Sequence, residues 1–117
     1  MDQRLAELIA TDGELVVTEP VVMEVTAGAR SDTQERALRS MLRRFGLLPF
    51  DPVADFDAAT RIYRRCRQAG VTPRGMVGCM IAAVAYRHDA TLLCWDADLD
   101  RVAGVIGIDL DGASLRA

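Results

Sequence analysis

One unbroken apolar segment restricts the fold of this chain more than any other feature. Residues 90–95 read Ala-Thr-Leu-Leu-Cys-Trp and contain no charged side chain. A strand of this composition is covered on both faces, as in the parallel sheets of α/β proteins. Residues 14–18 form a second run, with Leu-Val-Val between Glu14 and Thr18. The two runs predict an α/β sandwich around a mainly parallel sheet.

Two helices are expected in the first half of the chain. Pro20 suits the first turn of a helix that ends near Gly28. Asp32 or Thr33 can cap the next helix, and Gly46 is a suitable terminator for it. Alternating strands and helices are therefore expected from residue 14 onward.

Two further helices are expected at residues 54–69 and after the capping pair Thr72-Pro73. Gly75 and Gly78 fall within the second of these, where each glycine costs about 1 kcal/mol relative to alanine. The side chains expected to face the core are Phe56, Ala59, Ile62, Tyr63 and Cys66 in the first helix, and Met76, Cys79, Met80, Ala83 and Val84 in the second.

The remaining elements are short. Leu5, Ala6, Leu8 and Ile9 have helical spacing and precede a break at residues 11–13. Residues 47–50 are an edge-strand candidate because they contain a proline. A helix at residues 99–105 and a strand at residues 108–110 complete the expected fold.

Length and composition favour one cytoplasmic domain. The chain has 117 residues, half of them hydrophobic, and no apolar run approaches the roughly 20 residues that span a bilayer. The N-terminus has no apolar signal region. The cysteines Cys66, Cys79 and Cys94 form no CxxC pair and are read as reduced core thiols. His88 follows an arginine at a helix end, where positive charge suits the helix dipole.

The charge is unevenly distributed along the chain. Net charge is −3, yet no acid lies between Asp57 and Asp89, and six aspartates fall between Asp89 and Asp111. The arginines at positions 61, 64, 65 and 67 are read first as the solvated outer face of a helix. Binding of an RNA backbone is the alternative for these four.

Acidic residues follow both predicted buried strands. Ligands of such folds bind beyond the carboxyl ends of the strands. Asp96 and Asp98 follow the strand ending at residue 95, and Glu24 lies about one turn into the helix after the strand ending at residue 18. Converging carboxylates suit Mg²⁺ or Mn²⁺. The alternative for Asp96 and Asp98 is a polar turn with a helix cap.

Four short motifs, in order along the chain, carry a family resemblance. They are Thr-Glu-Pro-Val-Val-Met-Glu-Val at residues 18–25, followed by Ala27-Gly28; Ala-Gly-Val-Thr-Pro-Arg at residues 69–74; Cys-Met-Ile-Ala-Ala-Val-Ala at residues 79–85; and Asp-Ala-Asp-Leu at residues 96–99, followed by Val102-Ala103. Together they resemble the PIN domain of VapC-type toxin ribonucleases from VapBC toxin–antitoxin systems.

The resemblance implies an endoribonuclease that depends on Mg²⁺ or Mn²⁺, forms a homodimer and is inhibited by a cognate antitoxin. In that family four acidic positions form the metal site. The second corresponds to Glu24 and the fourth to Asp96, with Asp98 as its near neighbour. Arg74 corresponds to an arginine beside the site and is the expected RNA contact.

The other two acidic positions have no counterpart in this sequence. The family's first acid follows a central N-terminal strand that precedes a helix, and the resemblance begins after both, as in an N-terminally incomplete domain. The third acid precedes the Cys-Met-Ile-Ala-Ala motif, where this chain has Gly78. Activity is therefore expected to be reduced or lost. The alternative is a non-catalytic PIN-like module that binds an antitoxin or another protomer.

Loss of the central strand also has a structural consequence. Residues 14–18 and 91–95 would then face each other across a gap, with unpaired backbone groups that cost about 1–3 kcal/mol each. Low stability, a collapsed gap, or repair by dimerisation or by a strand from another chain is expected.

Overall fold

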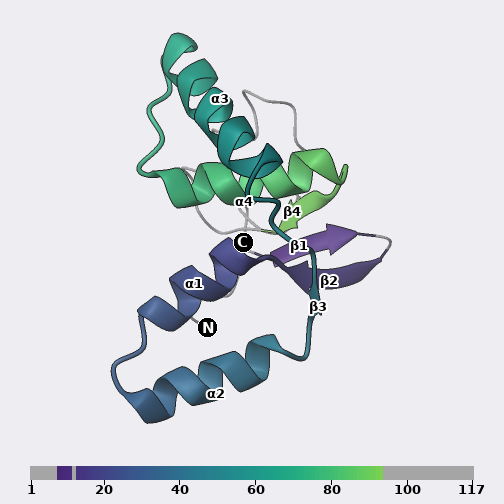
Figure 1. Cartoon of the computed structure of the whole chain (residues 1–117), viewed down its shortest axis with the longest axis vertical. Helices are drawn as coiled ribbons and strands as arrows, with labels where there is room; N and C mark the ends of the chain where they lie inside the picture. The colour runs from purple at the N-terminus through teal and green to yellow at the C-terminus, as the bar shows by residue number, and fades with distance from the viewer. Residues whose placement is uncertain (1–7, 12, 94–117) are drawn as a thin grey trace.

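The described part of the chain alternates strands and helices. The computed structural model describes residues 8–11 and 13–93. Its elements are β1 (Leu8–Thr11), β2 (Glu14–Val17), α1 (Glu19–Ala27), α2 (Asp32–Leu42), β3 (Gly46–Leu47), α3 (Ala54–Gln68), α4 (Met76–Arg87) and β4 (Thr91–Leu93). Figure 1 shows α3 and α4 above the sheet and α1 and α2 below it. The expected α/β class is confirmed. The elements predicted at residues 99–105 and 108–110 lie outside the described residues.

The sheet is mixed, with strand order β3-β2-β1-β4. Strands β2 and β3 are parallel, and β1 is antiparallel to both β2 and β4. Consequently β2, β3 and β4 all run in one direction, as a parallel α/β frame requires, and β1 alone runs against them. The expected edge strand is β3, which ends at Leu47, two residues before Pro49.

The prediction of a helix at residues 5–9 is wrong for the two residues that the structure describes, since Leu8 and Ile9 belong to β1. Ile9 pairs with Val16 of β2 and with Leu92 of β4, and its side chain is completely buried. Asp12 and Gly13 join Thr11 to Glu14, and this dipeptide favours a two-residue hairpin. Gly13 has the positive φ, 80°, that such turns require.

The expected gap in the sheet is therefore absent. The position between β2 and β4 is filled by β1, so the chain's own N-terminal hairpin pairs the backbone groups of both neighbours. Neither collapse nor a strand from another chain is needed to close this part of the sheet.

The helices begin and end close to their expected positions, although their caps differ. The side chain of Ser31, not Asp32 or Thr33, caps α2 by accepting a 3.0 Å hydrogen bond from the Gln34 amide. The first helical residue of α4 is Met76, with Gly75 as its N-cap, so Thr72-Pro73 lies upstream of the cap. Gly75 is thus outside the helix interior, so the cost of glycine relative to alanine in a helix does not apply to it.

The core is built around α4. Residues 81–85 of this helix are all buried, as expected for a helix that is apolar all round and packed on several sides. Cys66 and Cys79 are buried in the same core, and Cys94 is outside the described residues. Two residues expected in the core are at its margin: Phe56 is 53% exposed and Met76 is 42% exposed.

Candidate functional site

The first component of the candidate site is the junction between β2 and α1. Thr18 follows the carboxyl end of β2, and its carbonyl accepts hydrogen bonds from Val21 and Val22 that start the helix. The Thr18 side chain is completely buried, and its hydroxyl has no hydrogen-bond partner among the described residues. A buried polar atom without a partner is uncommon in folded proteins. Its position inside the Thr-Glu-Pro motif was the available sequence signal, yet Thr18 was not singled out.

Glu24 is the sixth residue of α1. It is half-buried, between the exposed Met23 and the fully buried Val25. No hydrogen bond or ion pair joins its carboxylate to the residues that the structure describes. Since α1 starts at the carboxyl end of β2, Glu24 lies on the side of the sheet where the sequence predicted a ligand site.

The third component is the start of α4. Gly78 is the third residue of this helix and is half-buried, and Arg74 is exposed just before the Gly75 cap. Three residues separate the end of α4 from β4, so α4 folds back along the strand and its first turn points toward the carboxyl edge. Helices α1 and α4 are in contact. Glu24 and Gly78 therefore lie on two packed helices.

Asp96 and Asp98 lie outside the described residues. They follow β4 in sequence, but nothing in the described structure tests their positions. Within residues 8–11 and 13–93, no group of three or more His, Cys, Asp or Glu side chains could hold a metal ion. The described part of the candidate site offers one carboxylate, Glu24, and one unpaired buried hydroxyl, that of Thr18. The Glu24 carboxylate supplies oxygen atoms, the donor type that Mg²⁺ and Mn²⁺ prefer.

A second polar cluster, which the sequence reasoning missed, joins α3 to the end of α4. Arg87 Nε donates to Asp55 Oδ1 at 2.9 Å, and Arg87 Nη2 donates to Asp55 Oδ2 at 2.8 Å and to the Pro49 carbonyl at 2.8 Å. The Asp51 amide also donates to Asp55 Oδ2, at 2.7 Å. Asp55 is only 1% exposed. The sequence held one signal of this pair. No acid lies between Asp57 and Asp89, so Arg87 near the end of α4 must find a carboxylate partner outside its own helix.

The environment of Asp55 favours its charged form. Burial alone would raise the pKa of this carboxyl, but hydrogen bonds from Arg87 and the Asp51 amide, with the positive charge of Arg87, hold its pKa below the usual 3.8. The same contact raises the pKa of the Arg87 guanidinium above its usual value. The pair is therefore ionised throughout the neutral range and acts as a fixed link between α3 and α4.

The chain belongs to the PIN domain family, whose family model matches residues 2–105. It is also similar to curated ribonucleases from mycobacteria. It is 38% identical, over 102 residues, to VapC ribonuclease Mb1587 of Mycobacterium bovis and to ribonuclease VapC11 of Mycobacterium tuberculosis. Each alignment covers 87% of this chain and 75% of the relative. The resemblance read from the four motifs is confirmed.

Among the described residues, no helix is both long and apolar enough to cross a membrane.

Proposed function

We propose that this chain is a toxin-type PIN endoribonuclease by descent, and that its cleavage of RNA is greatly reduced or lost. The observation that carries the proposal is that α1, which bears Glu24, packs against α4, which bears Gly78, in a VapC-like chain. One acidic position of the site is retained on α1, and glycine stands at the next acidic position, on α4. Both relatives are named ribonucleases, which supports RNA as the substrate. The cytoplasm is the proposed place of action.

Glu24, Asp96 and Asp98 are the proposed ligands for Mg²⁺ or Mn²⁺, with Glu24 and Asp96 as the catalytic carboxylates. When bound, such an ion supplies an activated water and stabilises charge on the phosphate. Arg74, exposed at the start of α4, is proposed to hold an RNA phosphate.

Gly78 is the reason for the proposed loss of activity. A glycine there provides neither a ligand nor negative charge, so the remaining carboxylates compensate the charge of a bound divalent ion poorly. The chain would then hold the ion weakly, and a pair of ions would be less favourable still. A site with fewer ligands positions the phosphate and the attacking water less well, and both effects lower the cleavage rate.

Metal binding tests the site separately from catalysis. Titration of the unmodified chain with Mn²⁺, followed by calorimetry, should give weak binding that Glu24→Gln reduces further. Thr33→Val, a substitution on the exposed side of α2, is a suitable control. Unchanged Mn²⁺ affinity in Glu24→Gln would remove Glu24 from the site.

A second candidate function, that of an antitoxin-binding or protomer-binding module, is favoured by the groove between α1 and α2. Its volume is about 760 Å³, and its apolar lining includes Met23, 50% exposed, and Leu47, 53% exposed. Arg39 and Glu35 form an ion pair of 2.9 Å at the rim. An amphipathic helix of a cognate antitoxin, or a second copy of this chain in a homodimer, fits an apolar groove with a charged rim.

Co-expression with a VapB-type antitoxin from an adjacent reading frame tests this second function. A complex that co-purifies with the unmodified chain and is lost with Met23→Glu would support it. Size-exclusion chromatography of the chain alone, at several concentrations, separates the homodimer from the antitoxin complex. A chain that stays monomeric and forms no complex with the antitoxin would contradict both the homodimer and the antitoxin-binding module.

A further inference from the structure

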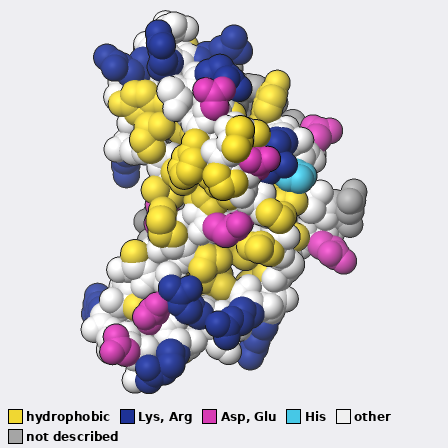
Figure 2. Space-filling view, viewed as in Figure 1, with side chains coloured by type: hydrophobic (Ala, Val, Ile, Leu, Met, Phe, Trp, Pro, Cys, Tyr) yellow, Lys and Arg dark blue, Asp and Glu magenta, His cyan; other side chains and the backbone are white. Residues whose placement is uncertain are grey.

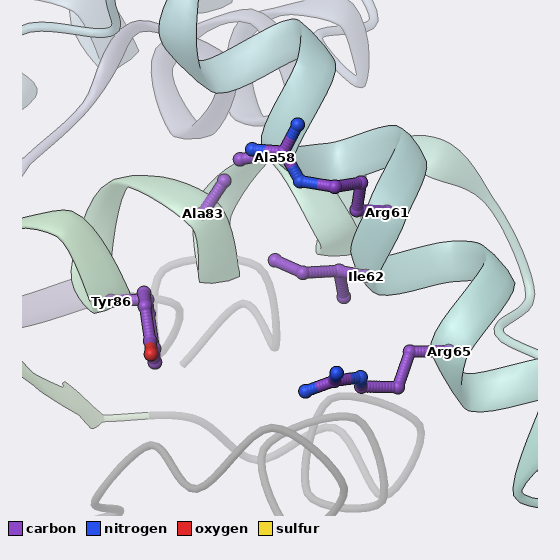
Figure 3. A pocket seen from close by; sticks show the side chains of 6 residues that line it. All are labelled: Ala58, Arg61, Ile62, Arg65, Ala83 and Tyr86. Atoms are coloured by element: carbon purple, nitrogen blue, oxygen red, sulfur yellow. The ribbon is translucent and has the colours of Figure 1, made fainter.

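A pocket between α3 and α4 has the composition of a nucleotide-binding site. It has a volume of about 250 Å³ and is lined by Ala58, Arg61, Ile62, Arg65, Ala83 and Tyr86 (Figure 3). The floor is apolar, since Ile62 is 8% exposed and Ala83 is 1% exposed. Two guanidinium groups from α3 form one rim. The Tyr86 ring, 63% exposed, lies on the α4 side.

The charge around this pocket is positive. Arg61 forms an ion pair with Asp57, one turn earlier in α3. Arg65 forms no ion pair with any residue of the described chain. The buried acid of α3, Asp55, is already held by Arg87. Arginine side chains gather over the C-terminal half of α3, which contains Arg64, Arg65 and Arg67 (Figure 2).

An aromatic ring, an apolar floor and a guanidinium without an ion pair among the described residues are the parts of a site for single-stranded nucleic acid. Bases stack on aromatic side chains, and phosphates bind arginine. The pocket is smaller than the roughly 300–1,000 Å³ of sites that enclose a whole small molecule. It therefore suits one unit of a longer ligand whose next phosphates meet the neighbouring arginines.

We propose that this pocket binds one nucleotide of a single-stranded RNA, with the base against Tyr86 and its phosphate on Arg65. The proposal rests on the proposed function for the choice of RNA. Tyr86 follows Gly78 by eight residues, about 12 Å along the helix axis at 1.5 Å per residue. One RNA strand can therefore reach both the candidate site at the start of α4 and this pocket, which would act as a second contact along the same strand.

Binding without cleavage tests the proposal. A fluorescent 2′-O-methyl oligonucleotide of about ten units, within the range of known single-strand sites, is titrated in EDTA and followed by anisotropy. Tyr86→Ala should weaken binding by roughly five- to a hundredfold through lost stacking, and Tyr86→Phe should restore it. Arg65→Ala should weaken binding and reduce the slope of log affinity against log salt by about 0.7.

The control is Arg44→Ala, which removes the same charge from an exposed turn after α2 and should leave binding within about twofold. Arg61→Ala should have a smaller effect than Arg65→Ala, because Asp57 already compensates Arg61. If Arg65→Ala and Tyr86→Ala both bind the oligonucleotide as tightly as the unmodified chain does, the pocket is overturned, whether or not the chain cleaves RNA. Binding that depends on these residues would uphold the pocket, whereas robust cleavage of RNA with Mn²⁺ by the same chain would contradict only the proposed loss of activity. No binding by the unmodified chain at low salt would overturn the pocket.

Discussion

The guanidinium of Arg87 holds the buried carboxylate of Asp55 through two hydrogen bonds, of 2.8 and 2.9 Å. The two residues are 32 positions apart and fix the start of α3 against the end of α4. Asp55 is 1% exposed, so its charge depends on this partner and on the Asp51 amide. Because α4 forms the core and carries Gly78 in its first turn, this link helps to set the position of the helix that the candidate site uses.

Replacing Arg87 by methionine should destabilise the fold by about 3 kcal/mol, since a buried charge left without its partner typically costs about 3–5 kcal/mol. The lower end of that range is expected because the Arg87 side chain is 35% exposed. Urea unfolding followed by circular dichroism measures the loss. Arg39→Met is the matched control, because Arg39 pairs with Glu35 on the surface and such pairs contribute about 0–1 kcal/mol. Equal losses in the two variants would contradict a special role for Arg87.

Acid should weaken the fold through Asp55. Its pKa is lower in the folded chain than in the unfolded chain, where it is near 3.8. Folding is therefore favoured by this group above pH 3.8, and the contribution is lost as the pH falls through the folded-state pKa. The difference in free energy of unfolding between pH 7 and pH 3, measured in urea, should be smaller in Asp55→Asn than in the unmodified chain. An unchanged difference would show that Asp55 does not carry this pH dependence.

Two glycines should respond differently to alanine. Gly13 has φ of 80° in the β1–β2 turn, a conformation that costs an L-residue about 1–2 kcal/mol. Gly75 has φ of −170° at the α4 cap, and a Cβ added there meets nothing within 4 Å. Gly13→Ala should lower the free energy of unfolding by about 1–2 kcal/mol, and Gly75→Ala by only about 0.5 kcal/mol, from the weaker capping preference of alanine. A harmless Gly13→Ala would contradict the hairpin that places β1.

Strand β1 should protect the middle of the sheet. Ile9 is completely buried and pairs on both sides, so Ile9→Ala should cost about 2–5 kcal/mol. Hydrogen exchange of the unmodified chain should show slow amides at residues 9–10. Leu15→Ala, at a 43% exposed position of the neighbouring strand, should cost less. Fast exchange throughout β1 would show that another element fills the centre of the sheet.

Sequence periodicity located the helices well, because their apolar spacing and end signals are local. The helix expected at residues 54–69 is observed as Ala54–Gln68. The same criterion failed at Leu8 and Ile9. A few apolar residues fit either a helix or a strand, and the choice was made by distant partners, β2 and β4. The predicted burial of Phe56 was also wrong: its side chain is 53% exposed, because the face of α3 that carries it is only partly covered.

The candidate site was predictable only where a motif marked it. Glu24 was predicted from its position after a buried strand and from the family resemblance; the structure places it on α1, and its role stays a prediction. The Asp55–Arg87 pair was missed because nothing in a sequence pattern joins residues from opposite ends of two helices. Asp96 and Asp98 remain predictions from the motif at residues 96–99.

Cleavage of a single-stranded RNA with Mn²⁺ by the unmodified chain and by Gly78→Asp tests the central claim most directly. Gly78→Asn, which matches the added side chain without its charge, is the control. The account predicts little or no EDTA-sensitive cleavage by the unmodified chain and by Gly78→Asn, and a gain of at least about tenfold in Gly78→Asp from the restored ligand. Robust EDTA-sensitive cleavage by the unmodified chain, lost in Glu24→Ala, would contradict the loss of activity assigned to Gly78.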